Sequence, residues 1–178
     1  YYLDFLKTLG AVDKAYLQDK LRTEIVLDGD RGILYSTPFL GALHLLPSFI
    51  RYRHIGLRDK LLVLYALIRV KLIDLSKNFT ELDRQSFYEW MKRHRQTDRA
   101  IDNLWNLIIL PILNDDIRNV SAAMGLMILR EGLLKRPADA AIGYSRVGLT
   151  SLTGEPAQRY LEEGGGVLLL GRGVKGLD

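Results

Sequence analysis

The first apolar positions of the chain recur with the spacing of a helix. Tyr2, Phe5, Leu6 and Leu9 stand at i, i+3, i+4 and i+7, so they would lie on one face of a helical segment. Gly10 follows at the position where a left-handed residue commonly ends a helix. The pattern predicts a short helix that ends near Gly10.

Between residues 21 and 36 the pattern changes to that of strands. Two apolar runs, residues 25–27 and 33–35, flank a turn that begins with Asp28-Gly29. Asp-Gly between two such runs favours a tight turn with left-handed backbone, which is typical of a β-hairpin. We therefore expect an antiparallel hairpin in this region.

After Pro38 the pattern is helical almost to residue 136. It predicts five helical segments, with breaks near residues 53–56, 76–83, 95–97 and 114–119. Ser86 and Glu89 have the spacing of a capping box, in which each side chain accepts from a backbone N–H group at the helix start. Thr97 is a candidate cap for the next helix.

Two of these helical segments are especially apolar. In the first, Pro111 is expected to kink or end the helix, and its apolar stripe consists of Ile101, Leu104, Trp105, Ile108 and Ile112. The second, residues 120–134, is apolar on nearly every side, which is typical of a helix surrounded by protein. We expect the two to pack together, with the second at the centre of the fold.

The end of the chain combines a helix with a strand. Residues 151–163 predict a helix that contains Pro156, the glycines at 164–166 predict a turn, and residues 167–170 predict a buried strand. The predicted fold class is α+β, mainly α, with an N-terminal hairpin and a C-terminal helix and strand. The predicted division is between a mainly helical region, residues 1–150, and residues 151–178.

Composition narrows the chemistry. The 178 residues are 48% hydrophobic and 26% charged, as in an ordinary globular protein. The net charge of +4 is a weak bias toward anionic partners. The absence of Cys excludes disulfides, thiolate metal sites and cysteine nucleophiles. Because the chain begins with neither Met nor an apolar signal core, we expect an internal fragment of a cytoplasmic protein.

Motifs for catalysis are weak, and the sequence identifies no catalytic residue. Residues 171–176 spell G-x-G-x-x-G, but no helix follows to hold a pyrophosphate, so we interpret this match as fortuitous. His44, His54 and His94 lack the spacing of a metal site, and we expect no metal and solvated histidines. Asp115 and Asp116 are expected to cap the next helix.

A basic segment, residues 40–76, offers two interpretations. Its basic residues include Arg51, Arg53, Arg58 and Lys60 around apolar runs, none of which reaches the roughly 18–20 apolar residues that a membrane span needs. The segment fits a helix in the membrane interface, peripheral on the inner face, and equally a core-packed helix with a solvated basic face. Too few aromatic residues accompany these charges for nucleic-acid binding, which we do not expect.

Several motifs occur in an order that resembles one enzyme family. They are Ser86-Phe-Tyr-Glu-Trp90-Met-Lys-Arg-His94, Leu110-Pro-Ile-Leu-Asn114, Ser121-Ala122-Ala123, Arg130-Glu131-Gly132 and Gly154-Glu155-Pro156. Together they are similar to the squalene-associated FAD-dependent desaturases, the hydroxysqualene dehydroxylase group of the phytoene-desaturase-like flavin amine oxidoreductases. One departure is Gly148, where the family pattern would have Pro.

The resemblance implies an oxidoreductase of isoprenoid, hopanoid or carotenoid biosynthesis that transfers hydride between FAD and a long apolar substrate. Residues 1–150 would be its substrate side, and residues 151–178 would return to the FAD domain. Val174 resembles a residue whose backbone meets the adenine end of FAD, although a core-strand valine is equally expected. The residues expected to line a substrate tunnel are Trp105, Ile109, Leu113, Asn114, Met124 and Met127.

Two other functions stay open on the sequence alone. The first is a noncatalytic helical module that binds lipid or a membrane surface, and it rests on the basic segment. The second is a helical domain that binds a protein partner, for which the sequence offers no positive signal. A strand, a glycine fingerprint and a helix upstream of the chain would favour the flavoenzyme.

Overall fold

The computed structural model describes residues 2–173 and 176, and the chain divides into two compact units. The larger unit is Asp19–Ile142, and the smaller combines Tyr1–Gln18 with Gly143–Asp178. Within the described residues each unit contains helices and a two-stranded antiparallel sheet, so the predicted α+β, mainly α class is confirmed.

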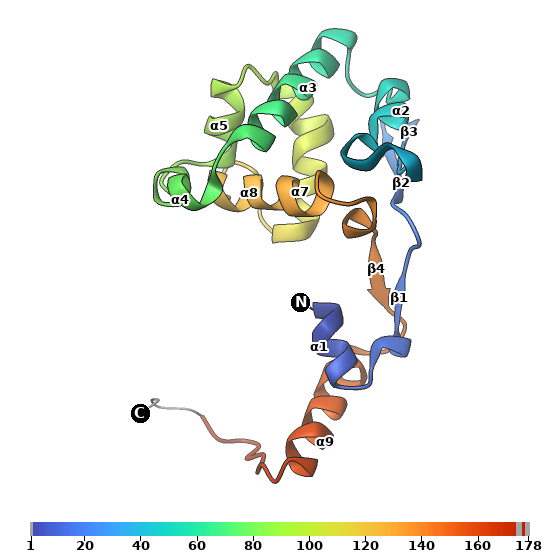
Figure 1. Ribbon diagram of the computed structural model, residues 1–178, viewed down its shortest axis with the longest axis vertical. Helices are drawn as coiled ribbons and strands as arrows, with labels where there is room; N and C mark the ends of the chain where they lie inside the picture. The colour runs from blue at the N-terminus through green and yellow to red at the C-terminus, as the bar shows by residue number, and fades with distance from the viewer. Residues whose placement is uncertain (1, 174–175, 177–178) are drawn as a thin grey trace. The chain divides into compact units, whose positions relative to one another are not determined.

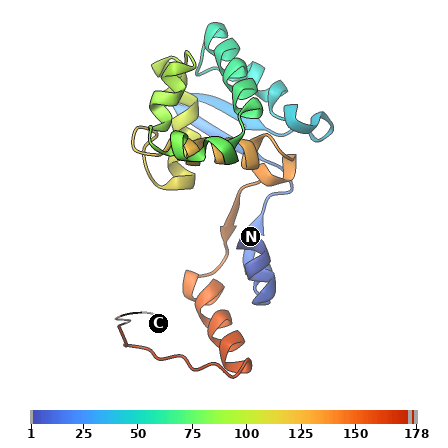
Figure 2. The ribbon, with the colours of Figure 1, turned by 60° about the vertical axis from the view of Figure 1, so that its left-hand side comes forward.

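The larger unit is a helical body with a hairpin against α2 (Figure 1, Figure 2). Its strands and helices are β2 (Arg22–Leu27), β3 (Asp30–Tyr35), η2 (Pro38–Leu43), α2 (Leu46–Arg51), α3 (Leu57–Leu72), α4 (Leu75–Asp83), α5 (Phe87–Arg93), α6 (Asp98–Ala100), η3 (Ile101–Trp105), α7 (Asn106–Leu113), α8 (Ala122–Ile128), η4 (Leu129–Leu133) and η5 (Pro137–Ala140). Two of these, η3 and η4, are single π-helical turns inside longer helices.

The predicted hairpin is confirmed. β2 and β3 pair antiparallel from Arg22 opposite Tyr35 to Leu27 opposite Asp30. Asp28 and Gly29 both have left-handed backbone, with φ of 51° and 83°, as a turn that matches the twist of the strands requires. The hairpin thereby places Leu34 in the main hydrophobic core.

The two predicted helix starts are also confirmed. The Ser86 hydroxyl accepts from the N–H of Glu89 at 3.2 Å, and the Glu89 carboxylate accepts from the N–H of Ser86 at 2.9 Å. The Thr97 hydroxyl accepts from the N–H of Ala100 at 3.1 Å. These side chains satisfy N–H groups that have no partner within the first helical turn.

The break predicted at residues 76–83 is wrong, because α4 occupies this stretch. Asp74 caps α4, and its carboxylate accepts from the N–H groups of Ser76 at 3.2 Å and Lys77 at 3.3 Å. The polar residues that suggested a loop lie on the exposed face, while Leu82 is buried. One strong cap and one buried leucine outweigh the weak intrinsic helix preference of these polar residues.

The two most apolar helices share one hydrophobic core, as predicted, since Trp105, Leu126 and Leu129 belong to the same cluster. Other expectations for these helices need correction. α8 packs against α4 and α5, and its Met127 is exposed, so the helix is not surrounded on every side. α7 continues through Pro111 to Leu113 and ends where Asn114 takes left-handed backbone with φ of 55°.

The smaller unit consists of α1 (Tyr2–Thr8), η1 (Val12–Lys14), β1 (Ala15–Leu17), β4 (Gly143–Ser145), η6 (Thr150–Gly154) and α9 (Glu155–Glu163). The short first helix is confirmed, and Gly10 beyond it has φ of 64°. Leu6, Ala11 and Leu152 form its core. β1 and β4 pair antiparallel, and the rings of Tyr16 and Tyr144 lie 5.0 Å apart across the pair.

The strand predicted at residues 167–170 is wrong. These residues follow the turn at Gly164 and Gly165, and their four apolar side chains are exposed. An isolated extended segment cannot become a strand without a partner to accept and donate its backbone hydrogen bonds. No strand among the described residues pairs with this one.

Candidate apolar binding cavity

A cavity of about 460 Å³ lies inside the larger unit. Its wall is formed by the hairpin strand β3, by η2, α2 and Leu45 between them, and by α3, η3, α7 and the end of η4. The lining residues are Leu34, Leu43, Leu45, Leu46, Phe49, Val63, Leu64, Leu67, Ile68, Lys71, Leu104, Trp105, Ile108, Leu133 and Leu134. Every lining side chain except Lys71 is apolar. This volume is within the range of small-molecule sites, and a wall of this kind suits a hydrocarbon better than a polar ligand.

Trp105 contributes the one indole ring of this wall. Its side chain is almost fully buried, and its ring N–H donates to Oε1 of Gln96 at 2.9 Å. Gln96 is itself buried and donates from Nε2 to the carbonyls of Leu62 at 2.8 Å and His94 at 3.1 Å. Because the indole N–H has its acceptor inside the protein, the rest of the ring can line the cavity without leaving a buried donor unpaired.

Both π-helical turns of the larger unit border the cavity. η3 provides Leu104 and Trp105, and η4 provides Leu133. A π turn inserts one residue into a helix and rotates the side chains that follow, and such turns are frequent at functional sites. The sequence analysis did not anticipate these turns, although three of their side chains line the cavity.

A buried histidine joins two walls of the cavity. His44 is fully buried, and its ring nitrogens lie 2.9 Å from Oγ of Ser36 and 2.9 Å from the carbonyl oxygen of Leu133. The expectation of solvated histidines is therefore wrong for His44. It is wrong for His54 as well, which is buried with Nε2 at 3.1 Å from the carbonyl of Ile25.

His94 also has a structural role. It is half-buried, its ring stacks on Trp90 with centroids 3.8 Å apart, and Nδ1 lies 2.8 Å from the carbonyl oxygen of Trp90. Across the described residues, no group of three or more His, Cys, Asp or Glu side chains is arranged to hold a metal ion. The three histidines act as hydrogen-bonding groups of the fold.

Next to His54, Tyr52 is a buried phenol that supports the hairpin side of the unit. It is fully buried and donates its hydroxyl to the carbonyl of Asn103 at 2.7 Å, and burial raises its pKa to about 12. Its ring lies edge-on to His54 at 5.0 Å. A β-carbon at Gly32 would lie 2.7 Å from both rings, so only glycine fits at this position of β3.

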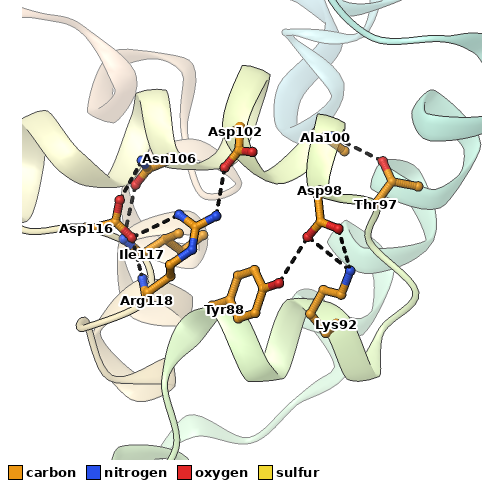
Figure 3. Close-up of polar contacts among 10 residues, drawn as sticks. All are labelled: Tyr88, Lys92, Thr97, Asp98, Ala100, Asp102, Asn106, Asp116, Ile117 and Arg118. Atoms are coloured by element: carbon orange, nitrogen blue, oxygen red, sulfur yellow. Dashed lines mark hydrogen bonds and ion pairs between the residues drawn. The ribbon is translucent and has the colours of Figure 1, made fainter.

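A polar cluster of the larger unit lies on its surface around Arg118 (Figure 3). The Arg118 guanidinium donates to Asp102 at 3.1 Å and Asp116 at 3.3 Å, and stacks 5.0 Å from the ring centre of Tyr88. The Tyr88 hydroxyl donates to Asp98 at 3.0 Å. Hydrogen bonds hold the pKa of two of these carboxyls below the usual value, for Asp98 chiefly from Lys92 and for Asp116 chiefly from the backbone N–H of Arg118.

We interpret this surface cluster as structural, because its carboxylates accept hydrogen bonds from neighbouring side chains and the pKa values of Asp98 and Asp116 are lowered. Acid catalysis would instead require a carboxyl with a raised pKa. The expectation that Asp115 and Asp116 cap the next helix is wrong, since Ser121 caps α8. The two carboxylates accept from Asp116, Arg118 and Asn119, within the turn between α7 and α8.

The structure places the other predicted tunnel residues away from the cavity wall. Ile109 is fully buried in the core, Leu113 and Met124 pack partly buried against it, and Asn114 and Met127 are exposed. Their roles in binding remain predictions, and of the six only Trp105 lies in the wall. Val174 lies outside the described residues.

Most lining residues were missed by sequence reasoning, which described the apolar runs of the basic segment, residues 40–76, without assigning them to a binding site. The sequence did offer one signal for these residues. Apolar residues that continue around a helix, instead of staying on one face, indicate that more than one face of the helix has an apolar partner.

The cavity can therefore enclose an apolar chain.

Within the described residues, no helix combines the length and the apolar character that crossing a bilayer requires. No model of a known protein family and no curated protein matches this chain.

Proposed function

We propose that this chain binds the substrate of an FAD-dependent oxidoreductase that acts on long isoprenoids such as hydroxysqualene, squalene or carotenoid precursors. The observation that carries this proposal is the cavity of about 460 Å³ with its almost wholly apolar wall. A hydrocarbon has no hydrogen-bonding groups, so its affinity comes from apolar area removed from water, at about 25 cal/mol per Å². The order of motifs that resembles the squalene-associated desaturases supports the same substrate class.

In this proposal Trp105 is the residue that orients the substrate. A planar ring that cannot turn offers an extended contact surface to a flexible chain, and Gln96 holds this ring in place through the 2.9 Å hydrogen bond. His44 joins the segments that carry Leu43 and Leu133, so it keeps two parts of the wall together. These contacts orient the substrate and keep water out of the cavity.

The flavin would supply the hydride chemistry, but the described residues do not fit a flavin site. A dinucleotide site needs a strand, a glycine-rich turn and a helix whose first N–H groups meet the pyrophosphate. The two sheets here are antiparallel pairs, and Gly171 to Gly173 are exposed with no helix following among the described residues. We therefore assign substrate binding alone to this chain.

The test is binding of radiolabelled squalene to the purified chain, separated from free squalene by gel filtration. Ile108→Phe places a larger side chain in the wall and should reduce retained squalene at least tenfold. Leu110→Phe is the matched control, because it lies two residues further along α7, is exposed and is not in the wall. Equal retention by both variants, or no retention by the parent chain, would contradict the proposal.

A further inference from the structure

α3 has a second apolar face that points away from the core. Its buried residues are Asp59, Val63, Ala66 and Val70. On the other side lie five exposed apolar residues, which we call the α3 stripe: Leu57, Leu61, Tyr65, Ile68 and Leu72. At about 3.6 residues per turn these five positions fall within about 80° of the helix circumference, opposite the buried face. Leu57 and Leu72, at the two ends, are 77% and 72% exposed.

Basic residues flank the α3 stripe on both sides. The same helical spacing places Arg58 and Arg69 along one edge, and Lys60 and Lys71 along the other. The one acidic residue of α3, Asp59, lies on the buried face, where its carboxylate accepts from Thr97 at 2.8 Å and from the N–H of Gly56 at 3.2 Å. The exposed side of the helix is therefore apolar along its middle and cationic along both edges.

The charges of this region are not neutralised locally. Residues 38–73 contain six Lys or Arg residues and one Asp. Among the described residues, Arg58, Arg69 and Lys71 have no carboxylate partner. Unpaired cations beside an exposed apolar stripe are the features of a helix that lies in the interface of an anionic membrane.

Some residues of the cavity wall are exposed on this face, and we call this point the mouth of the cavity. Ile68 belongs both to the α3 stripe and to the cavity wall, and Lys71 lies in the wall and on the cationic edge. Leu43 of η2 also lines the cavity and is exposed. The cavity wall therefore reaches the surface that carries the stripe, and our proposal takes this point as the entrance for an apolar ligand.

We propose that the α3 stripe docks on the surface of an anionic lipid bilayer, with its apolar residues at the boundary of the acyl chains, and that the cavity is filled from that bilayer through the mouth at Ile68 and Lys71. The docking follows from the stripe and its charges alone, whereas the filling step rests on the proposed function.

Charge complementarity favours a bilayer over a second copy of the chain. In a symmetric dimer the same surface of both copies forms the interface. A dimer through the α3 stripe would therefore bring the basic edges of the two α3 helices together. Like charges held opposite each other oppose association. Anionic headgroups would instead neutralise both edges while the acyl region receives the stripe.

The first experiment is flotation of the chain with vesicles of phosphatidylcholine containing phosphatidylglycerol, compared with phosphatidylcholine alone. We expect binding to the anionic vesicles that weakens as salt is raised. Arg58→Gln with Arg69→Gln should weaken it about fivefold for each charge removed. The control pair Arg84→Gln and Arg93→Gln, also exposed, should leave it unchanged.

A triple variant tests the apolar face. Leu57→Gln, Leu61→Gln and Leu72→Gln are all exposed and outside the cavity wall, so the fold and the cavity should persist while vesicle binding is lost. The matched control is Leu110→Gln, Ile112→Gln and Met127→Gln, at three exposed apolar positions on other helices. Absence of vesicle binding by the parent chain, or equal binding by both triple variants, would overturn the proposal. So would a parent dimer that the first triple variant dissociates without any change in vesicle binding.

The filling step is measured as squalene uptake from two donors, vesicles and cyclodextrin. We expect the first triple variant to lose uptake from vesicles and to keep uptake from cyclodextrin. Equal uptake from vesicles by parent and variant would overturn the filling step. If squalene enters from neither donor while vesicle flotation persists, the proposed function fails and the docking surface stands.

Discussion

The indole N–H of Trp105 donates to the side-chain oxygen of Gln96 at 2.9 Å, and both side chains are almost completely buried. Gln96 is also bonded to two helices, because its amide N–H groups donate to the backbone carbonyls of Leu62 in α3 and His94 at the end of α5. One glutamine therefore fixes the ring in the cavity wall and ties it to two helices.

Gln96→Leu should lower the free energy of unfolding by about 1–3 kcal/mol, because it leaves the buried indole N–H without an acceptor. Urea unfolding followed by circular dichroism measures the change. Gln158→Leu, at an exposed position of α9, is the control and should stay within about 0.5 kcal/mol of the parent. Equal stability of Gln96→Leu and the parent would show that the bond to Trp105 does not support the fold.

Gly125 and Gly132 should respond differently to alanine. A β-carbon at Gly125 would lie 2.4 Å from Cγ of the buried Phe87, whereas one at Gly132 would meet nothing within 4 Å. Overpacking costs roughly 1–3 kcal/mol, which exceeds the helix preference for alanine of about 1 kcal/mol. Gly125→Ala should therefore lower the melting temperature and Gly132→Ala should keep or raise it.

A second substitution checks the cause. Phe87→Leu should cost less stability in the Gly125→Ala background than in the parent chain, because the smaller side chain relieves the overlap. Strict additivity of the two changes would mean that Phe87 is not the residue that excludes alanine.

The stability of the larger unit should fall at alkaline pH through Tyr52. Burial raises the pKa of this phenol to about 12 in the folded chain, compared with about 10 in an unfolded chain. The unfolded state therefore releases the proton first, so this contribution to stability is complete below pH ~10 and is lost as pH rises toward ~12. Unfolding free energies measured across this window should decline in the parent and decline less in Tyr52→Phe. An identical decline in both would exclude Tyr52 as the cause.

The chain should bind FAD weakly or not at all, because its described residues contain no strand followed by a glycine-rich turn and a helix, the unit that holds the pyrophosphate. Equilibrium dialysis against FAD, with free riboflavin as a comparison for nonspecific binding, measures this directly. A purified chain that is yellow and holds FAD in a one-to-one ratio would show the prediction to be wrong.

Local features of this fold were predictable from the sequence, since they depend on neighbouring residues. The turn at Asp28-Gly29 and the capping box of Ser86 and Glu89 each lie within a few positions, and both are confirmed. Asp74 shows the limit of the same reasoning, because polar residues after a good cap can be either loop or exposed helix face.

The cavity was not predictable in the same way. Trp105 lies in the cavity wall, and its role in binding stays a prediction. Leu34 and Leu133 are distant from it in sequence, and only the folded chain brings them to the same cavity. The π turns at η3 and η4 have no sequence signal that periodicity detects, yet they rotate the side chains that follow. Ile109 and Met124, which were predicted to line a substrate tunnel, belong to the hydrophobic core outside this cavity wall, and their roles in binding stay predictions.

The most direct measurement of the central claim is photoaffinity labelling with a squalene analogue that carries a diazirine, followed by peptide mapping. The account predicts labels in α3 between Val63 and Lys71 and around Leu104 and Ile108, and excess squalene should abolish them. Labels confined to exposed apolar residues such as Leu169 and Leu170, or labels that squalene does not displace, would contradict the claim that this cavity binds a long isoprenoid.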